Sequence, residues 1–244
     1  MKKLIAICFL LVPVIVSATG AGEHLMHVKI DLKDKRSLQH GAKLFVNYCL
    51  SCHSASYMRF NRVAKDLGIP RDVMKKNMLF VTDKLGNTMK VAMRKKDAKK
   101  WLGVAPPDLS VITRSRGPDW VYSFLNSFYL DEKRPTGVNN LVFKDTAMPH
   151  VLWELQGWQR PVYSEHHEGE ESRKTINELE LVYPGKMNEE DFQAATRDLV
   201  NFLTYVGEPA KLVRYKTGVW VILFLIVFLI PAYLLKKEYW KDVR

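Results

Sequence analysis

The stretch Cys49-Leu50-Ser51-Cys52-His53 decides how this chain is interpreted. Cys-x-x-Cys-His is the attachment pattern of haem c, because two thiols three positions apart reach the two vinyl groups of one porphyrin and the adjacent imidazole is held under the iron. A thioredoxin-like pair does not require the histidine, and a zinc site would need two further ligands at short spacing. The motif therefore predicts a covalent haem.

The residues before the motif predict a helix that runs into it. Gly41, Phe45 and Cys49 are spaced by four and lie on one stripe of such a helix. A small residue on this stripe lets a second helix approach closely, and a helix that begins at an Asn188 N-cap and stops at Gly207 is the candidate partner. Its apolar face contains Phe192, Ala195, Leu199, Phe202, Leu203 and Val206. Terminal helices crossing near a haem are the cytochrome c arrangement, although the periodicity alone would allow any pair of helices. We expect an all-α, cytochrome c-like haem domain.

The first residues have the pattern of a secretory signal peptide. Two lysines precede an apolar run over residues 4–16, and small residues suited to cleavage after Ala18 or Ala21 follow. A membrane anchor is the alternative, but the run is shorter than the roughly 20 residues of a spanning helix. We therefore predict that residues 1–21 are removed on export, and that Cys8 leaves with them.

The C-terminal residues have the pattern of a membrane anchor. Residues 218–235 carry no charge, cations flank the run on both sides, and aromatic residues lie near its boundaries. This is typical of a single transmembrane helix, with a buried core helix as the alternative. Together with an exported N-terminus, the anchor places residues 22–210 in the periplasm as the haem domain and residues 236–244 in the cytoplasm, at a bacterial inner membrane.

The sixth iron ligand has to come from another part of the chain. Met148 precedes Pro149, which forces it out of helical geometry and into a loop that can present its thioether. His150 is the next candidate. The remaining candidates are Met58, Met74, Met78, Met89, Met93, Met187, His24, His27, His40, His166 and His167. Several of these methionines are four positions apart, which is the spacing of a packing face, where methionine is ordinary.

Two stretches have the composition of haem-crevice walls. Residues 105–110 form a rigid Pro-Pro turn ending in an Asp108 N-cap, and Arg114 and Arg116 follow. An arginine fork suits a haem propionate, with a solvated arginine pair as the alternative. Apolar residues within 121–128 form one face of a further helix, which is more often core than cofactor contact.

These motifs, in this order, resemble those of the cytochrome c1 family over roughly residues 36 to 244. The matching stretches are residues 49–54, 106–110 with 114–116, 134–138 and 147–149, followed by the last amphipathic helix and its membrane span. The resemblance implies that Cys49 and Cys52 are thioether attachment points and that His53 and Met148 are the proximal and distal iron ligands. It also implies that Arg116 meets a propionate and that Pro107 packs against the ring.

The resemblance further implies a role in electron transfer. Such a subunit passes single electrons from a Rieske iron-sulfur subunit through haem c to a c-type cytochrome, within a dimeric quinol:cytochrome c oxidoreductase that also contains cytochrome b. It performs no quinol chemistry itself, and its other expected contact is membrane lipid, not nucleic acid. The alternative is a free-standing membrane-anchored cytochrome c that donates to a terminal oxidase. A less favoured alternative is a haem enzyme whose iron has an open coordination site.

The charge of this chain departs from the family pattern. Relatives usually present an acidic face to a basic soluble cytochrome, whereas this chain has a formal net charge of +11 and a very basic stretch within residues 59–101. One acidic cluster remains, formed by Glu165, Glu168, Glu170 and Glu171. It is a candidate for steering a partner, with a solvated loop as the alternative.

Overall fold

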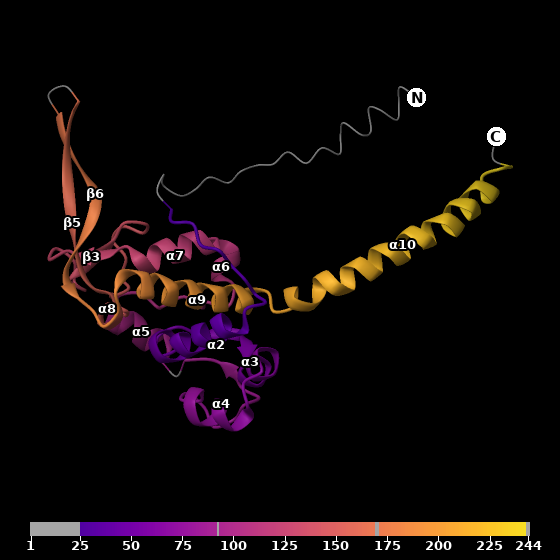
Figure 1. Ribbon diagram of the computed structural model, residues 1–244, viewed down its shortest axis with the longest axis horizontal. Helices are drawn as coiled ribbons and strands as arrows, with labels where there is room; N and C mark the ends of the chain where they lie inside the picture. Colours follow the sequence, from indigo (N-terminus) through magenta and orange to yellow (C-terminus); the bar gives the residue numbers. More distant parts are fainter. Residues whose placement is uncertain (1–24, 92, 169–170, 243–244) are drawn as a thin grey trace.

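The computed structural model describes residues 25–91, 93–168 and 171–242, so the predicted signal peptide, residues 1–21, lies outside it. Most helices gather into one body, from which a hairpin of strands projects at one end and a long C-terminal helix at the other (Figure 1). The elements are, in chain order, α2 (Lys35–Leu44), η1 (Phe45–Cys49), β1 (Ala55–Arg59), α3 (Phe60–Leu67), α4 (Arg71–Met78), β2 (Thr88–Met89), α5 (Lys95–Leu102), α6 (Ile112–Ser115), α7 (Pro118–Asn126), β3 (Phe128–Leu130), β4 (Val138–Asn140), α8 (Trp153–Gln156), β5 (Gly157–Glu168), β6 (Glu171–Pro184), α9 (Glu189–Gly207) and α10 (Lys211–Tyr239).

The crossing of α2 and α9 is the centre of the domain, as the spacing of Gly41 predicted. A Cβ added at Gly41 would lie 2.0 Å from the Asp198 carbonyl oxygen and 2.8 Å from the Cβ of Phe202. The Phe45 and Phe202 rings pack one turn further along, with their centroids 5.7 Å apart. The Asp198 carboxylate accepts hydrogen bonds from Ser37 Oγ at 2.7 Å and from the His40 ring at 2.8 Å. Glycine is therefore what lets the two helices approach closely enough for these contacts.

Helices α2 and α9 each begin at a capping residue. The side chain of this residue accepts hydrogen bonds from first-turn amides that have no partner within the helix. Asp34 accepts from the Arg36 and Ser37 amides ahead of α2, and Asn188 accepts from the Asp191 amide at 2.8 Å. The Asn188 N-cap and the end of α9 at Gly207 are therefore confirmed. Helix α2 then widens into the π-helical turn η1, which ends at Cys49. Single π turns are frequent at functional sites, and this one turns the chain into the haem motif.

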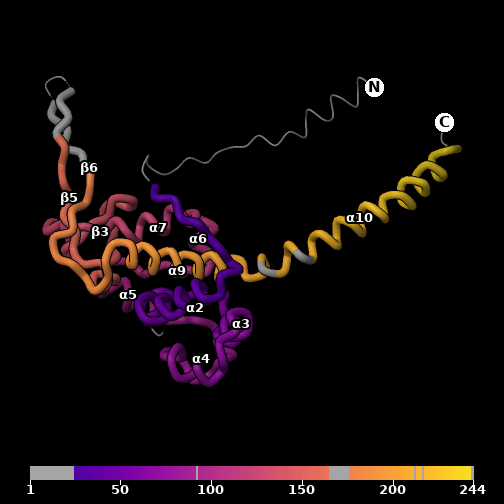
Figure 2. Tube along the Cα trace, in the orientation of Figure 1, coloured from indigo at the N-terminus to yellow at the C-terminus, as the bar shows by residue number. Residues whose placement is uncertain are grey.

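Of the two methionine pairs predicted as packing faces, Met74 and Met78 lie on α4 and are buried. The prediction is wrong for the second pair, because Met89 lies in strand β2 and Met93 follows it, half-buried and outside any helix. Met58, Met74 and Met89 are almost fully buried, and Met78 is buried as well. In the trace of Figure 2, α3 and α4 follow below α2, and the hydroxyl of Tyr205 on α9 donates to Asp66 of α3 at 2.8 Å. These methionines act as packing residues.

The expectation of an all-α domain is correct only in part, because the described residues contain three two-stranded antiparallel sheets. β1 pairs with β2, β3 with β4, and β5 with β6 in a long hairpin that projects from the body (Figure 1). Cross-strand partners such as Arg160 and Glu180, 2.8 Å apart, support the hairpin. The backbones of Glu165, Glu168 and Glu171 from the predicted acidic cluster lie toward the hairpin tip, and Glu170 lies outside the described residues.

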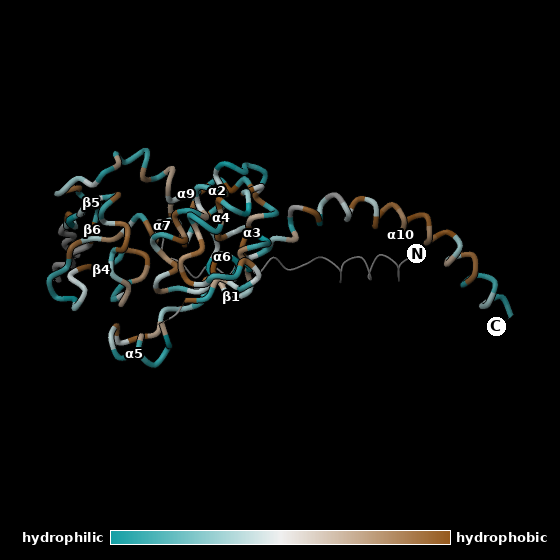
Figure 3. Tube along the Cα trace, turned by 90° about the horizontal axis from the view of Figure 1, so that it is seen from below, coloured by the Kyte–Doolittle hydropathy of each residue, from teal (hydrophilic) through white to brown (hydrophobic). Residues whose placement is uncertain are grey.

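Helix α10 leaves the domain and contains the predicted span of residues 218–235. A stretch from Val213 to Tyr239 is long and apolar enough to cross a membrane, and none of its apolar window is buried within the chain. Figure 3 shows this helix as a mainly hydrophobic rod separate from the domain. Pro231 lies inside it, where its missing amide removes one hydrogen bond of the helix.

Candidate haem-attachment site

The motif lies on one tight turn at the end of η1, whose last residue is Cys49. The amides of Cys52 and His53 both donate to the Cys49 carbonyl, at 3.0 and 2.7 Å, which folds the motif back on the end of the helix. Both thiols are free, with Cys49 buried and Cys52 half-buried. Burial, with the neighbouring Cys52 as a second cause, raises the pKa of the Cys49 thiol to about 12. Two unpaired thiols therefore stand beside one imidazole, as covalent haem attachment requires.

The orientation of the His53 ring is set by a residue far along the chain. Its Nδ1 lies 2.8 Å from the Pro107 carbonyl oxygen. A carbonyl only accepts, so Nδ1 carries the proton and the lone pair of Nε2 is free. Burial lowers the pKa of His53, outweighing the opposing effects of this hydrogen bond and of Asp108. A neutral imidazole held through its other nitrogen is the form that metal-ligating histidines take.

The segment around Pro107 is fastened to the residues that follow the motif. The Leu109 amide donates to the Ser54 carbonyl at 2.7 Å, and the Asp108 carboxylate accepts from the Ser56 and Ser110 amides at 3.1 and 2.8 Å. Burial raises the pKa of Asp108, but the hydrogen bonds from Ser110 and Ser56 outweigh it and leave the pKa below its ordinary value. Asp108 therefore helps to hold Pro107 in the position from which its carbonyl oxygen contacts His53.

The predicted role of Asp108 as a helix N-cap is wrong. α6 begins only at Ile112, and its N-cap position is Val111, which makes no side-chain cap. Asp108 instead closes the turn at Ser110, two residues on. Asp side chains commonly bond the backbone two residues further along, and this local turn is what Asp108 forms.

Arg116 lies beside an aromatic ring and is free to meet an anion. Its guanidinium carbon is 5.1 Å from the centroid of the Trp120 ring, and its side chain is exposed. No ion pair joins it to a carboxylate in the part of the chain that the structure describes. Stacked, unpaired arginine is well suited to a haem propionate.

The loop that carries Met148 is held by the 134–138 stretch. Arg134 donates to the Asp145 carbonyl at 3.0 Å and pairs with its carboxylate at 3.1 Å. Asp145 has a positive φ of 62°, a conformation that needs such support. Met148 follows, half-buried, with its amide 3.3 Å from the Thr146 hydroxyl. The stretches 134–138 and 147–149, which are separate along the chain, thus form one structural unit.

An aromatic row joins Arg116 to the Met148 loop. Ring centroids are 5.3 Å apart for Trp120 and Phe124, 5.1 Å for Phe124 and Phe128, and 5.1 Å for Phe128 and His150. Burial lowers the pKa of His150 to about 4 against a smaller opposing effect of the Gly157 backbone, and its Nε2 has no hydrogen-bond partner. The predicted helix face within residues 121–128 is wrong at its end, because α7 ends at Asn126 and Phe128 belongs to strand β3, from which it continues the row.

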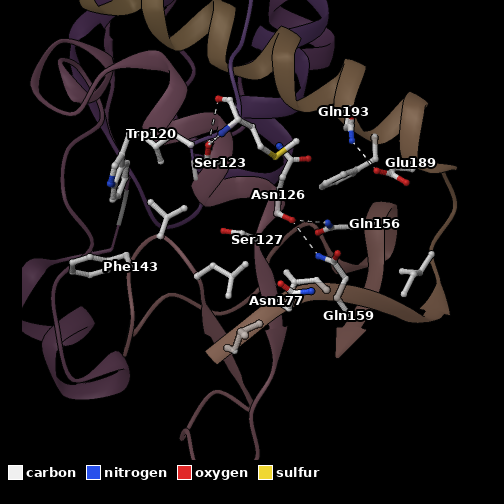
Figure 4. A pocket seen from close by; sticks show the side chains of 18 of the residues that line it. Trp120, Ser123, Asn126, Ser127, Phe143, Gln156, Gln159, Asn177, Glu189 and Gln193 are labelled. Atoms are coloured by element: carbon white, nitrogen blue, oxygen red, sulfur yellow. Dashed lines mark hydrogen bonds between the residues drawn. The ribbon is translucent and has the colours of Figure 1, made fainter. Parts of the chain in front are cut away.

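A separate hollow of about 790 Å³ lies where the base of the hairpin meets α7 and α9. Figure 4 shows amide side chains around it, including Gln156 and Gln159, which both donate to the Asn126 carbonyl at 3.1 Å. Arg116 and Trp120 are among its lining residues, whereas Cys49, Cys52, His53 and Met148 are not. The hollow therefore shares Arg116 and Trp120 with the candidate site but does not contain the cysteines or the two candidate iron ligands.

The free thiols and the preset imidazole fit covalent haem, and the described residues include one helix apolar enough to span a membrane. Together these features define a membrane-anchored c-type cytochrome. The chain matches the Cytochrome C1 family over residues 27–243 and belongs to that family. It is 52% identical to a cytochrome c1 of Allochromatium vinosum, with all of both chains covered. It is also 45% identical to a protein of Nitrosomonas europaea named ammonia monooxygenase gamma subunit, covering all of this chain and 99% of that one. A Bradyrhizobium diazoefficiens protein named cytochrome b/c1 is 26% identical over 86% of this chain and 34% of its own length.

Membership of this family establishes the role of the chain. It is the covalently haem-bearing electron-transfer subunit of a cytochrome bc1 complex, anchored in a membrane. The expectations of haem c and of electron transfer are therefore confirmed. The individual site residues and the orientation in the membrane remain predictions.

Proposed function

We propose that the chain holds its haem on Cys49 and Cys52 and coordinates the iron through His53 Nε2 and the Met148 thioether. The observation that carries this proposal is the 2.8 Å contact between His53 Nδ1 and the Pro107 carbonyl, which leaves only Nε2 available to a metal. When bound, haem c supplies an iron that takes up and releases one electron. Thioether ligation favours a high reduction potential, which suits a late electron carrier.

The remaining site residues orient and enclose the cofactor. Pro107 would contact the ring as well as fix His53, and Arg116 would neutralise a propionate from its place over Trp120. The row from Trp120 to His150 forms an apolar wall beside the Met148 loop. Such a wall excludes water from the site. Because the local dielectric is then low, the electrostatic interactions of nearby charged groups are stronger.

We also propose the assembly and the topology. Residues 22–210 form a periplasmic domain, residues 218–235 span the inner membrane once, and residues 236–244 stay in the cytoplasm. Electrons arrive from a Rieske iron-sulfur subunit and leave to a c-type cytochrome, in a dimeric complex with cytochrome b. The apolar helix α10 supports the anchor. The relative whose name joins cytochrome b and c1 supports the association with cytochrome b. The substrate chemistry belongs to the other subunits.

The distal ligand is tested with Met148→Leu in the assembled complex. The haem should stay attached, because the thiols and His53 are untouched, while the sulfur-to-iron charge-transfer band disappears and the reduction potential falls. Each drop of about 59 mV makes one-electron reduction about tenfold less favourable, so turnover should fall far more than assembly.

Met187→Leu is the matched control for this test. Met187 is also half-buried in a loop, where its amide donates to the Leu155 carbonyl at 3.0 Å. Its replacement should leave the band and the potential as they are. An unchanged band in Met148→Leu would mean that another residue is the ligand.

A further inference from the structure

Helix α5 is an exposed, basic element that the haem site does not use. Residues 90–102 contain six cations, namely Lys90, Arg94, Lys95, Lys96, Lys99 and Lys100, and one acid. That acid, Asp97, pairs with Arg94 at 2.7 Å. The four lysines of α5 are exposed and make no ion pair within the described chain. The helix therefore presents four uncompensated positive charges.

The apolar residues of α5 point in two directions. Ala98 is buried and fixes the helix to the domain, whereas Trp101 is 67% exposed at the C-terminal end and Val104 is 49% exposed just beyond it. At 100° per residue, Lys96 and Lys100 lie opposite Ala98. An exposed tryptophan beside unpaired cations has the composition of a protein interface, in which aromatic residues supply contact and charges supply steering.

Both ends of the segment that contains α5 are fastened to the haem motif. On one side the Val91 amide donates to Ser54 Oγ at 3.0 Å. On the other side the Leu109 amide donates to the Ser54 carbonyl at 2.7 Å, next to the His53–Pro107 contact. Residue 54 directly follows the motif, so the segment that carries α5 begins and ends beside the attachment site. Electron transfer slows steeply with distance, and a partner docked here would lie close to the attachment site.

We propose that α5, with Trp101, is the docking surface for an acidic electron-accepting cytochrome. This inference rests on the proposed function. It adds where on this chain the partner docks and that the docking face of the partner is negatively charged. Charge complementarity selects a protein with an acidic face, since like-charged faces would repel. An anionic membrane surface fits less well, because α5 and the start of α10 lie at different ends of the domain in Figures 1 and 3.

The test uses the intact complex in detergent, reduced by quinol, with two soluble acceptors. One is a lysine-rich cytochrome c, and the other is the same cytochrome with its lysines succinylated. The native complex should reduce the succinylated cytochrome faster, and this rate should fall as salt is added. Lys99→Glu/Lys100→Glu should lower the rate about tenfold at about 0.1 M salt, within the range known for steered association. Trp101→Ala should lower it at high salt as well.

The matched control is Lys75→Glu/Lys76→Glu on α4. This helix also has eight residues and two adjacent exposed lysines, and the charge change is identical. With both variants compared at about 0.1 M salt, where charge is screened beyond roughly 10 Å, its rate should stay within about twofold of the native complex. Equal losses in the two variants would overturn the proposal in favour of a general charge effect. A loss seen only in vesicles of anionic lipid, and not in detergent, would assign α5 to the membrane.

The proposed function fails separately from the docking surface. Reduction of haem c by quinol, followed by absorbance without any soluble cytochrome, should be the same in the native complex and in every variant. Its absence in the native complex would overturn the proposed function. Normal haem reduction with an unchanged rate to the succinylated cytochrome in Lys99→Glu/Lys100→Glu would overturn only the docking surface.

Discussion

Replacing Gly41 by alanine should destabilise the haem domain although alanine is the better helix former. The added Cβ would lie 2.0 Å from the Asp198 carbonyl oxygen and 2.7 Å from its carbon, and backbone atoms cannot rotate away. Overpacking of this kind costs about 3 kcal/mol at the upper end of its usual range. The higher helix propensity of alanine offsets about 1 kcal/mol. The net loss is about 2 kcal/mol, which lowers the melting temperature by about 4–8 °C in a domain of this size.

The measurement is thermal unfolding of the purified chain, followed by helical circular dichroism and by haem absorbance. Gly86→Ala is the control, because a Cβ at Gly86 meets nothing within 4 Å and its φ is not positive. It should change the stability by less than about 0.5 kcal/mol. Equal stability of Gly41→Ala and the native chain would refute the close helix crossing as the reason for the glycine.

Two further predictions concern pH and the anchor. His150 is neutral when folded, because burial lowers its pKa to about 4 from an ordinary 6.5. The unfolded chain takes up a proton below about pH 6.5, so this stabilisation is complete above 6.5 and is lost as pH falls toward 4, by about 3 kcal/mol. His150→Leu should therefore flatten the pH dependence of the urea unfolding midpoint between about pH 4 and 6.5. An unchanged pH dependence would mean that it arises from other groups. Truncation after Glu208 should yield a soluble domain that keeps its haem, since α10 is not buried against it; aggregation without haem would contradict the domain boundary.

Local patterns in the sequence determined the main parts of this protein. Cys49, Cys52 and His53 lie within five positions, the apolar run of α10 needs no partner to be recognised, and Asn188 caps its helix through its own side chain. The four-residue spacing of Gly41 and Phe45 also predicted the crossing with α9, because a helix converts sequence spacing directly into a face. Such features depend on neighbouring residues, so the sequence alone carries them.

The tertiary structure decided the contacts that orient the site. The bond from His53 to Pro107 joins residues 54 positions apart through a backbone carbonyl, which has no signature in the sequence. The same is true of Arg134, which holds the Asp145 carbonyl ahead of the Met148 loop. The long β5–β6 hairpin was missed because strand pairing depends on which two segments meet, not on either alone. Likewise, the lysines of α5 were visible as charge, but only the folded chain joins both ends of their segment to Ser54, next to the haem motif.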